Sequence, residues 1–271
     1  MSLRILSYNI RRGGTGREEL LAAVIRAADV DLVVLQEATR PGVVARLATM
    51  TGLKAYAATA GRSLAFISRI PIAHHRWVRP RFSQHAFLEI IPRELDVHVI
   101  GVHLSAVHAA WTERRRVREL RSLLADLTRS QLGPHVVIGD FNTIAPDEQL
   151  DVSRLPRRLR LLVWLSGGRI RWQTIAIMLG AGYADSFRGV HAGEAGPTFP
   201  TWDPHIRLDY AFVPKQDVQR VTRCDVVTHG NVVRSASDHF PLRLEFAIDS
   251  LNVFSGVPEE HWPEAEPLRV R

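Results

Sequence analysis

The chain has 271 residues, of which 46% are apolar and 23% are charged, as is typical of a globular protein with a large core. It contains no run of about 18 apolar residues, which excludes a membrane-spanning helix. Its single cysteine, Cys224, excludes an intramolecular disulfide and an all-thiolate metal site.

The formal net charge of +7 comes almost entirely from arginine, because Lys54 and Lys215 are the only lysines. A basic surface draws anionic substrates by long-range attraction. Genome composition is the alternative explanation of the arginine bias, and charge alone does not choose among DNA, RNA, phospholipid and nucleotide as substrates. The chain enters a predicted strand within three residues and lacks a secretory-signal pattern, so we expect a cytoplasmic protein.

Apolar runs alternate with helical patterns through the first half of the chain. We expect strands at residues 3–6, 32–35, 63–68, 97–102, 135–138 and 210–213, and a further strand starting at 240–242. We expect helices at residues 18–28, 41–50 and 112–129. The third helix has a predicted inward face of Val117, Leu120, Leu124 and Leu127 and an outward face of Arg114, Arg115, Arg118 and Arg121. This alternation predicts a layered α/β core.

The predicted domain spans residues 1–250, and residues 251–271 form a tail that loses periodicity and gains proline and glutamate. Residues 154–181 form a predicted insertion, in which arginine is mixed with tryptophan and leucine between Arg157 and Trp172. One interpretation is a helix pair or lid packed on the core. The other is a segment that faces the substrate, lies at a lipid headgroup or stacks on bases.

The segment Ile138-Gly139-Asp140-Phe141-Asn142 carries the strongest functional signal. It follows a run rich in β-branched residues, and Gly133-Pro134 marks the start of that strand. Side chains repeat with a period of two along a strand, so we expect Asp140 and Asn142 on the same side of the pleat. The strand end therefore presents a proton acceptor and an amide donor together.

Four other polar clusters follow or flank short apolar runs. They are Ser7-Tyr8-Asn9, Leu35-Gln36-Glu37, Gly101-Val102-His103-Leu104 and Ser237-Asp238-His239-Phe240-Pro241, the last preceded by Arg207-Leu208-Asp209-Tyr210. A layered core would carry these strand ends to one edge, where such side chains suit a hard divalent ion and an acid–base pair. In these motifs and their order, residues 3–247 resemble the endonuclease/exonuclease/phosphatase superfamily. That group contains pancreatic-type DNases, abasic-site endonucleases, sphingomyelinases, inositol polyphosphate 5-phosphatases and deadenylases.

The resemblance implies the DNase I-like fold, a four-layer α/β/β/α sandwich with two packed, mostly antiparallel or mixed β-sheets. It also implies Mg²⁺ or Mn²⁺, with Glu37 as the principal ligand, Asn9 assisting at the metal or the phosphate, and Asp238 as a second carboxylate on the metal side. Such ions prefer carboxylate oxygens and several waters. The alternatives are a solvated carboxylate for Glu37 and a backbone-capping amide for Asn9.

The resemblance assigns catalytic roles as well. Asp140 would orient and deprotonate the attacking water, and Asn142 would donate to the phosphate. His103 would give a proton to the leaving alkoxide. The alternative is a structural histidine at the end of a strand, with its hydrogen bonds satisfied. His239 would stabilise the charge that builds on the phosphate oxygens, and Asp209 would fix its tautomer.

His103 also discriminates among the subfamilies. Abasic-site endonucleases carry a tyrosine at the corresponding place, so this enzyme class is disfavoured. Trp202, in Thr198-Phe199-Pro200-Thr201-Trp202, and Arg207 are predicted to contact the substrate. Asp185 is expected to have a structural role, as a cap or as a pairing partner, and to take no part in the reaction. Histidines without a motif, such as His85, are predicted to be structural or at the surface.

We therefore expect a metal-dependent phosphoesterase that hydrolyses a small or lipid-linked ester by in-line water attack. A non-specific endonuclease or exonuclease is the alternative, and a non-catalytic binding module of the same fold is another, although every catalytic position is filled. The chain has no zinc-finger or helix-turn-helix signature. We expect a monomer that binds a phosphate ester, with nucleic acid and a membrane surface as the alternative partners.

Overall fold

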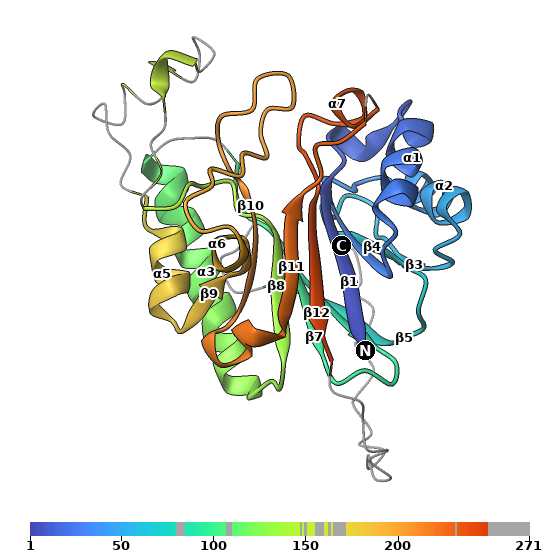
Figure 1. The fold of residues 1–271 in the computed structure, drawn as a ribbon, viewed down its shortest axis with the longest axis horizontal. Coiled ribbons are helices and arrows are strands. Elements are labelled where there is room, and N and C mark those ends of the chain that lie inside the picture. Colours follow the sequence, from blue (N-terminus) through green and yellow to red (C-terminus); the bar gives the residue numbers. More distant parts are fainter. Residues whose placement is uncertain are drawn as a thin grey trace, which may run out of the picture.

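The computed structural model describes most of the chain. The described residues are 1–79, 85–106, 110–146, 148, 151–154, 160–161, 164, 172–230 and 232–248. They form two six-stranded sheets packed face to face, with helices on both outer faces (Figure 1). The predicted four-layer sandwich is therefore confirmed. The predicted tail and most of the segment from Arg157 to Trp172 lie outside the described residues.

The first sheet has the strand order β11-β12-β1-β2-β4-β3. Its strands are β1 (Ser2–Asn9), β2 (Leu32–Gln36), β3 (Ala55–Ala57), β4 (Ala65–Ser68), β11 (Val221–Val226) and β12 (Leu242–Ala247). The central strands β1 and β2 run parallel, and the other neighbouring pairs are antiparallel. The helices on its outer face are α1 (Glu18–Ala28), α2 (Pro41–Thr51) and the short α7 (Val233–Ala236).

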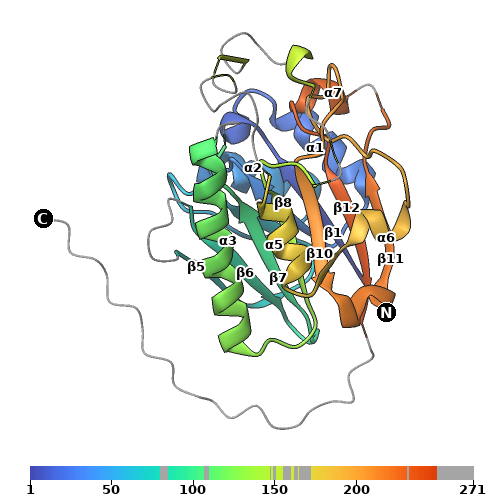
Figure 2. The ribbon, with the colours of Figure 1, turned by 90° about the vertical axis from the view of Figure 1, so that its left-hand side faces the viewer.

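The second sheet has the order β5-β6-β7-β8-β10-β9. Its strands are β5 (Ile72–Val78), β6 (Phe87–Pro92), β7 (His98–His103), β8 (His135–Asp140), β9 (Tyr183–Asp185) and β10 (Asp209–Pro214). Here β7 and β8 form the parallel pair. The long helix α3 (Ala110–Ser130) and α5 (Thr174–Gly180) cover the outer face (Figure 2). Shorter helices lie in the connections: η1 (Arg12–Gly14), η2 (Val152–Arg154), α6 (Ser186–Val190) and η3 (Lys215–Arg220).

Three large apolar clusters form the core. One lies between the sheets, and one lies under the helices on each outer face. The central strands are therefore buried on both faces, which explains the unbroken apolar run at residues 32–35. The sheets approach so closely that a Cβ added to Gly101 would lie 2.8 Å from Cγ1 of Val34.

The two parallel pairs determine where the polar strand ends meet. Asn9 lies opposite Gln36 in the first sheet, and His103 lies opposite Asp140 in the second. A hydrogen bond from Asn9 to Asp140 joins the two edges across the sandwich. The first and last strands are also neighbours, since β1 pairs with β12 along its length.

Gly139 is required by the close pairing of β7 with β8. Its φ is +154°, and a Cβ added there would lie 1.9 Å from the carbonyl oxygen of Val102. No side chain fits at that distance, so a glycine must precede Asp140 if His103 and Asp140 are to lie side by side.

Helix α3 differs from its predicted faces. Leu124 packs against the core, as expected, but is only partly buried, whereas Leu123, outside the predicted inward face, is buried. Glu113, Arg116 and Glu119 are also buried, with exposed fractions of 3%, 0% and 2%. The helix thus buries a polar stripe beside its apolar stripe, because these charges have partners on the helix itself and in the loops packed against it.

The buried charges of α3 bind one another and the neighbouring loops. Oε2 of Glu113 accepts from Nε of Arg116 at 3.0 Å, and Oε1 accepts from the backbone N–H groups of Gln173 and Thr174 at 2.8 Å each. Nη1 of Arg116 donates to the carbonyl oxygen of Ser105 at 2.7 Å. Burial alone would raise the pKa of Glu113, but the charge of Arg116 and these hydrogen bonds hold that pKa below its usual value.

We predict that Gly139→Ala destabilises the fold by about 3 kcal/mol or more, because the added methyl overlaps with the backbone of β7. Gly180→Ala is the matched control: it lies in α5, its Cβ meets no atom within 4 Å, and we expect it to stabilise by roughly 0.5–1 kcal/mol. Urea unfolding gives both differences. A Gly139→Ala protein as stable as the parent would contradict the role of the β7–β8 contact.

We predict that Glu113→Gln lowers the free energy of unfolding at neutral pH by roughly 3–5 kcal/mol, because Arg116 remains buried without its carboxylate. A lowered pKa contributes stability above the unfolded-state value of 4.5 and loses it as the pH falls through the folded-state value. The variant should therefore lose less stability on acidification than the parent. Unfolding curves across this pH range test the prediction, with the exposed Glu94→Gln as control. Parallel acid profiles for parent and Glu113→Gln would refute it.

Candidate active site

The side-chain amide of Asn9 connects the two sheets at the predicted site. It is 1% exposed, and its Nδ2 donates to Oδ2 of Asp140 at 3.0 Å and to Oε1 of Glu37 at 3.4 Å. Glu37 follows β2 directly, in a left-handed conformation with φ of +55°, and also accepts from the backbone N–H of Arg12. The polar ends of β1, β2 and β8 thus meet at one point.

Asp140 lies between two imidazole rings. Its Oδ2 is 3.9 Å from Nε2 of His103 and 3.9 Å from Nε2 of His239. Its Oδ1 accepts from the backbone N–H of Asn142 at 2.8 Å, which fixes the carboxylate. The Asn142 amide itself donates to the carbonyl oxygen of Leu104 at 3.0 Å. A carboxylate held in this way is suited to orient a water and to accept its proton.

Asp209 orients His239. Its Oδ2 is hydrogen-bonded to Nδ1 of the ring at 2.9 Å, which leaves Nε2 on the side of Asp140. Burial alone would lower the pKa of His239, but the negative charges of Asp209 and Asp140 outweigh burial and raise that pKa to about 10. The ring is therefore cationic at neutral pH and can donate from Nε2.

Ser63 and His85 flank His103, although the sequence motifs indicate neither. Nδ1 of His103 is hydrogen-bonded to the hydroxyl of Ser63, and the ring centroids of His85 and His103 are 5.4 Å apart. Burial, together with the charge of His103, lowers the pKa of His85. His85, which is predicted to be structural or at the surface, thus lies beside His103 and lines the same pocket.

The loop from Thr198 to Trp202 forms an aromatic wall beside His239. The Phe199 ring lies 4.8 Å from the His239 ring, and the Trp202 ring lies 6.2 Å from that of Phe199. Trp202 is 65% exposed, so its face is open to a ligand at the rim of the site. Its contact with substrate stays a prediction.

Arg207 does not reach the site. It is 1% exposed, and its guanidinium pairs with Asp185 at 2.7 Å and with Glu148 at 3.0 Å. The predicted substrate contact is therefore corrected to a structural role, because an enclosed guanidinium with two carboxylates cannot touch a ligand in the cleft. Asp185 also accepts from two backbone N–H groups at the start of α6, so its predicted capping and pairing role is confirmed.

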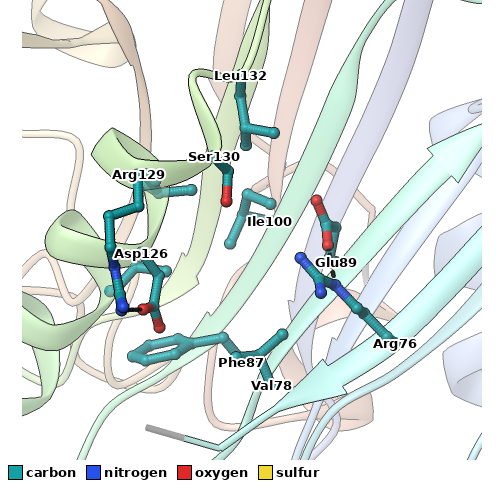
Figure 3. A pocket seen from close by; sticks show the side chains of 11 residues that line it. Arg76, Val78, Phe87, Glu89, Ile100, Asp126, Arg129, Ser130 and Leu132 are labelled. Atoms are coloured by element: carbon teal, nitrogen blue, oxygen red, sulfur yellow. Dashed lines mark hydrogen bonds and ion pairs between the residues drawn. The ribbon is translucent and has the colours of Figure 1, made fainter. Parts of the chain in front are cut away.

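A separate hollow lies between α3 and the outer face of β5, β6 and β7 (Figure 3). Its volume is about 340 Å³, and no predicted site residue is among the described residues that line it. Its charged side chains pair with one another, Arg76 with Glu89 and Arg129 with Asp126. We therefore assign no function to it.

The model of the Endonuclease/Exonuclease/phosphatase family matches residues 6–239. The chain belongs to this family. It is therefore a member of a group of phosphoester hydrolases, which confirms the resemblance drawn from the strand-end motifs. No curated protein matches the sequence. Among the described residues, no helix is long and apolar enough to cross a membrane.

Solved structures share the fold at low identity. The Neisseria 3′ phosphatase NExo, bound to a product DNA hairpin, is 19% identical with a TM-score of 0.69, and the match covers 90% of this chain and 99% of that one. An endonuclease/exonuclease/phosphatase from Beutenbergia cavernae is 22% identical with a TM-score of 0.66, covering 91% and 72%. TDP2 from Caenorhabditis elegans is 15% identical with a TM-score of 0.61, covering 91% and 74%.

Enzymes of this family use a divalent metal, and two groups of side chains offer ligands. Within the described part of the chain, Asp140, Asp209 and His239 form the one trio with ligand atoms within 4.8 Å of one another. In that trio, Oδ2 of Asp209 is already hydrogen-bonded to Nδ1 of His239 at 2.9 Å. Glu37 is only half-buried and lines an open pocket with room for coordinated waters, so it fits a hard ion better.

Asp238 has a cationic partner in this structure. Its Oδ2 lies 3.1 Å from Nε of Arg11. The hydroxyl of Ser237 donates to the carbonyl oxygen of Asn9 at 2.6 Å, which keeps Asp238 close to the end of β1. Its assignment as a second metal-side carboxylate stays a prediction.

Proposed function

We propose that this protein is a divalent-metal-dependent phosphoesterase that hydrolyses its substrate by in-line attack of water. The observation that carries the proposal is the placement of Asp140, whose Oδ2 lies 3.9 Å from both His103 and His239 and accepts from the buried amide of Asn9. One carboxylate thus borders a cationic ring, a second imidazole and an amide donor. Phosphoryl transfer needs this combination of positioning and charge stabilisation.

Each residue then has a defined task. Asp140 orients the attacking water and takes its proton. The cationic His239, held by Asp209, stabilises the charge that builds on the phosphate oxygens. His103 gives a proton to the leaving alkoxide. A divalent ion bound by Glu37 and Asn9, with Asp238 on the same side, would supply further positive charge at the phosphate.

The substrate proposed from the sequence is a small or lipid-linked ester. Most of the segment from Arg157 to Trp172, the predicted lid or lipid-contacting segment, lies outside the described residues. DNA is the second candidate, because the chain is similar to a phosphatase whose structure holds a DNA product. The net charge of +7 suits either anionic substrate and does not choose between them. Both substrates require the same chemistry at Asp140.

We predict that chelation abolishes hydrolysis and that Mg²⁺ or Mn²⁺ restores it. Asp140→Asn should lower kcat by roughly 10²–10⁴-fold, because the general base is lost. Glu37→Ala should raise the metal concentration for half-maximal activity by about tenfold or more. Metal titrations of activity, with calorimetric metal binding to Asp140→Asn, separate the two roles. Hydrolysis that persists after exhaustive chelation would exclude a metal-dependent mechanism.

We predict that salt distinguishes the two substrate candidates. If DNA is bound through six to ten phosphates, affinity should fall by about 10³–10⁵-fold between roughly 50 and 200 mM salt, as counterions are released. A small ester should show a much shallower response. Parallel KM measurements on duplex DNA and on a soluble chromogenic phosphodiester give the two slopes. Efficient, steeply salt-sensitive DNA cleavage without turnover of small esters would reject the first candidate.

A further inference from the structure

A pocket opens beside the candidate site, and both Glu37 and His103 line it. Its volume is about 550 Å³, which lies within the range of small-molecule sites. The other side of Asp140 is closed by His239, behind which lie Asp209 and the Phe199 ring. A phosphate ester held at Asp140 therefore has room to extend toward the pocket.

The charged side chains that line this pocket are mainly cationic. Arg12, Arg62 and Arg79 line it, and Glu37 is the one carboxylate among its described lining residues. All three arginines are exposed residues at this pocket. Guanidinium groups match phosphate oxygens in a bidentate geometry. The lining therefore favours a ligand with negative charge beyond that of the scissile phosphate.

The wall of the pocket is ordered by hydrogen bonds and stacking. Nε1 of Trp77 donates to the carbonyl oxygen of Leu64 at 2.9 Å, which fixes the indole. The guanidinium carbon of Arg62 lies 5.3 Å from the indole centroid, in a cation–π contact that orients it. Ser63, which lies between Arg62 and Leu64 in the sequence, is hydrogen-bonded to His103. One short segment thus positions both a cation of the pocket and an imidazole of the site.

We propose that this pocket is an anion subsite that binds a second phosphate group, carried by the alcohol that leaves on hydrolysis. The inference rests on the proposed function, in which His103 protonates the leaving oxygen. Because His103 borders both Asp140 and the pocket, the leaving alcohol extends among Arg62 and Arg79. The substrate class is an ester whose leaving group bears a further phosphate, supplied by a soluble phosphorylated alcohol or by the next nucleotide of a DNA strand.

Two matched substrate pairs test the subsite. The soluble pair is thymidine 3′,5′-bisphosphate and thymidine 3′-phosphate. The strand pair is a trithymidylate with either a phosphate or an uncharged methylphosphonate next to the cleaved position. The ratio of KM values within each pair is measured for the parent, Arg62→Gln, Arg79→Gln and Arg93→Gln, the last an exposed arginine outside the pocket lining.

We expect the second phosphate to lower KM by about tenfold in at least one pair, as charge-assisted hydrogen bonds do. The pair that responds identifies the source of the phosphate. The ratio should fall toward one in Arg62→Gln and Arg79→Gln and should be unchanged in Arg93→Gln. A ratio near one in both pairs for the parent overturns the subsite.

A binding measurement separates failure of the subsite from failure of the proposed function. Calorimetry with thymidine 3′,5′-bisphosphate uses the Asp140→Asn protein, in which turnover is blocked, with and without Arg62→Gln. A roughly tenfold loss of affinity on adding Arg62→Gln supports the subsite even if no ester is hydrolysed by the parent. Equal affinities with and without Arg62→Gln overturn it, whatever the outcome of the hydrolysis assays.

Discussion

The hydrogen bonds of one buried amide hold the two halves of the site together. Asn9 ends a strand of the first sheet and Asp140 ends a strand of the second, so the 3.0 Å bond between them aligns the sheets at this edge. The same amide reaches Glu37. A buried donor of this kind is stable only while its acceptors stay in place. The spacing of acid, base and predicted metal ligand therefore depends on how the sheets pack.

Helix α3 supports this arrangement from behind the second sheet. Its buried Arg116 holds the backbone at Ser105, two residues after His103. Its Glu113 accepts from the hydroxyl of Thr143 at 3.1 Å, directly after Asn142 in the chain. The segments that follow β7 and β8 are thus anchored to one buried ion pair. A polar network with satisfied partners fixes geometry more tightly than apolar packing alone, because its bonds are directional.

Local sequence patterns were sufficient to predict the strand ends, and the strand ends contain most of the site. Asp140 and Asn142 follow an apolar run, and Glu37 follows another, so periodicity alone places them at a sheet edge. The pairing of His103 with Ser63 and the approach of His85 could not be predicted in the same way. They depend on which loops the sandwich brings together, and the sequences of those loops lack the hydrophobic periodicity of a helix or a strand.

The buried charges could not be predicted for the same reason. Helical periodicity alone gives no reason to bury Glu113 or Arg116, because Glu113 binds Thr174 in a distant segment and Arg116 binds the carbonyl oxygen of Ser105 in the preceding loop. Arg207 stands two residues before Asp209 in a motif, and that position suggests a place in the cleft. Its guanidinium turns instead toward Asp185 and Glu148, which only the tertiary structure brings near.

The pairing of β1 with β12 has a consequence for biosynthesis. Ser2 lies opposite Ala247, so the central part of the first sheet stays incomplete until almost all of the described chain has left the ribosome. Asn9 and His239, which contribute to the same site, are far apart in the sequence and are therefore made at widely separated times. A nascent or prematurely terminated chain therefore holds no assembled centre, and contacts of such long sequence separation form late and slowly. Assembly of the candidate site therefore requires a chain that extends through His239 and β12.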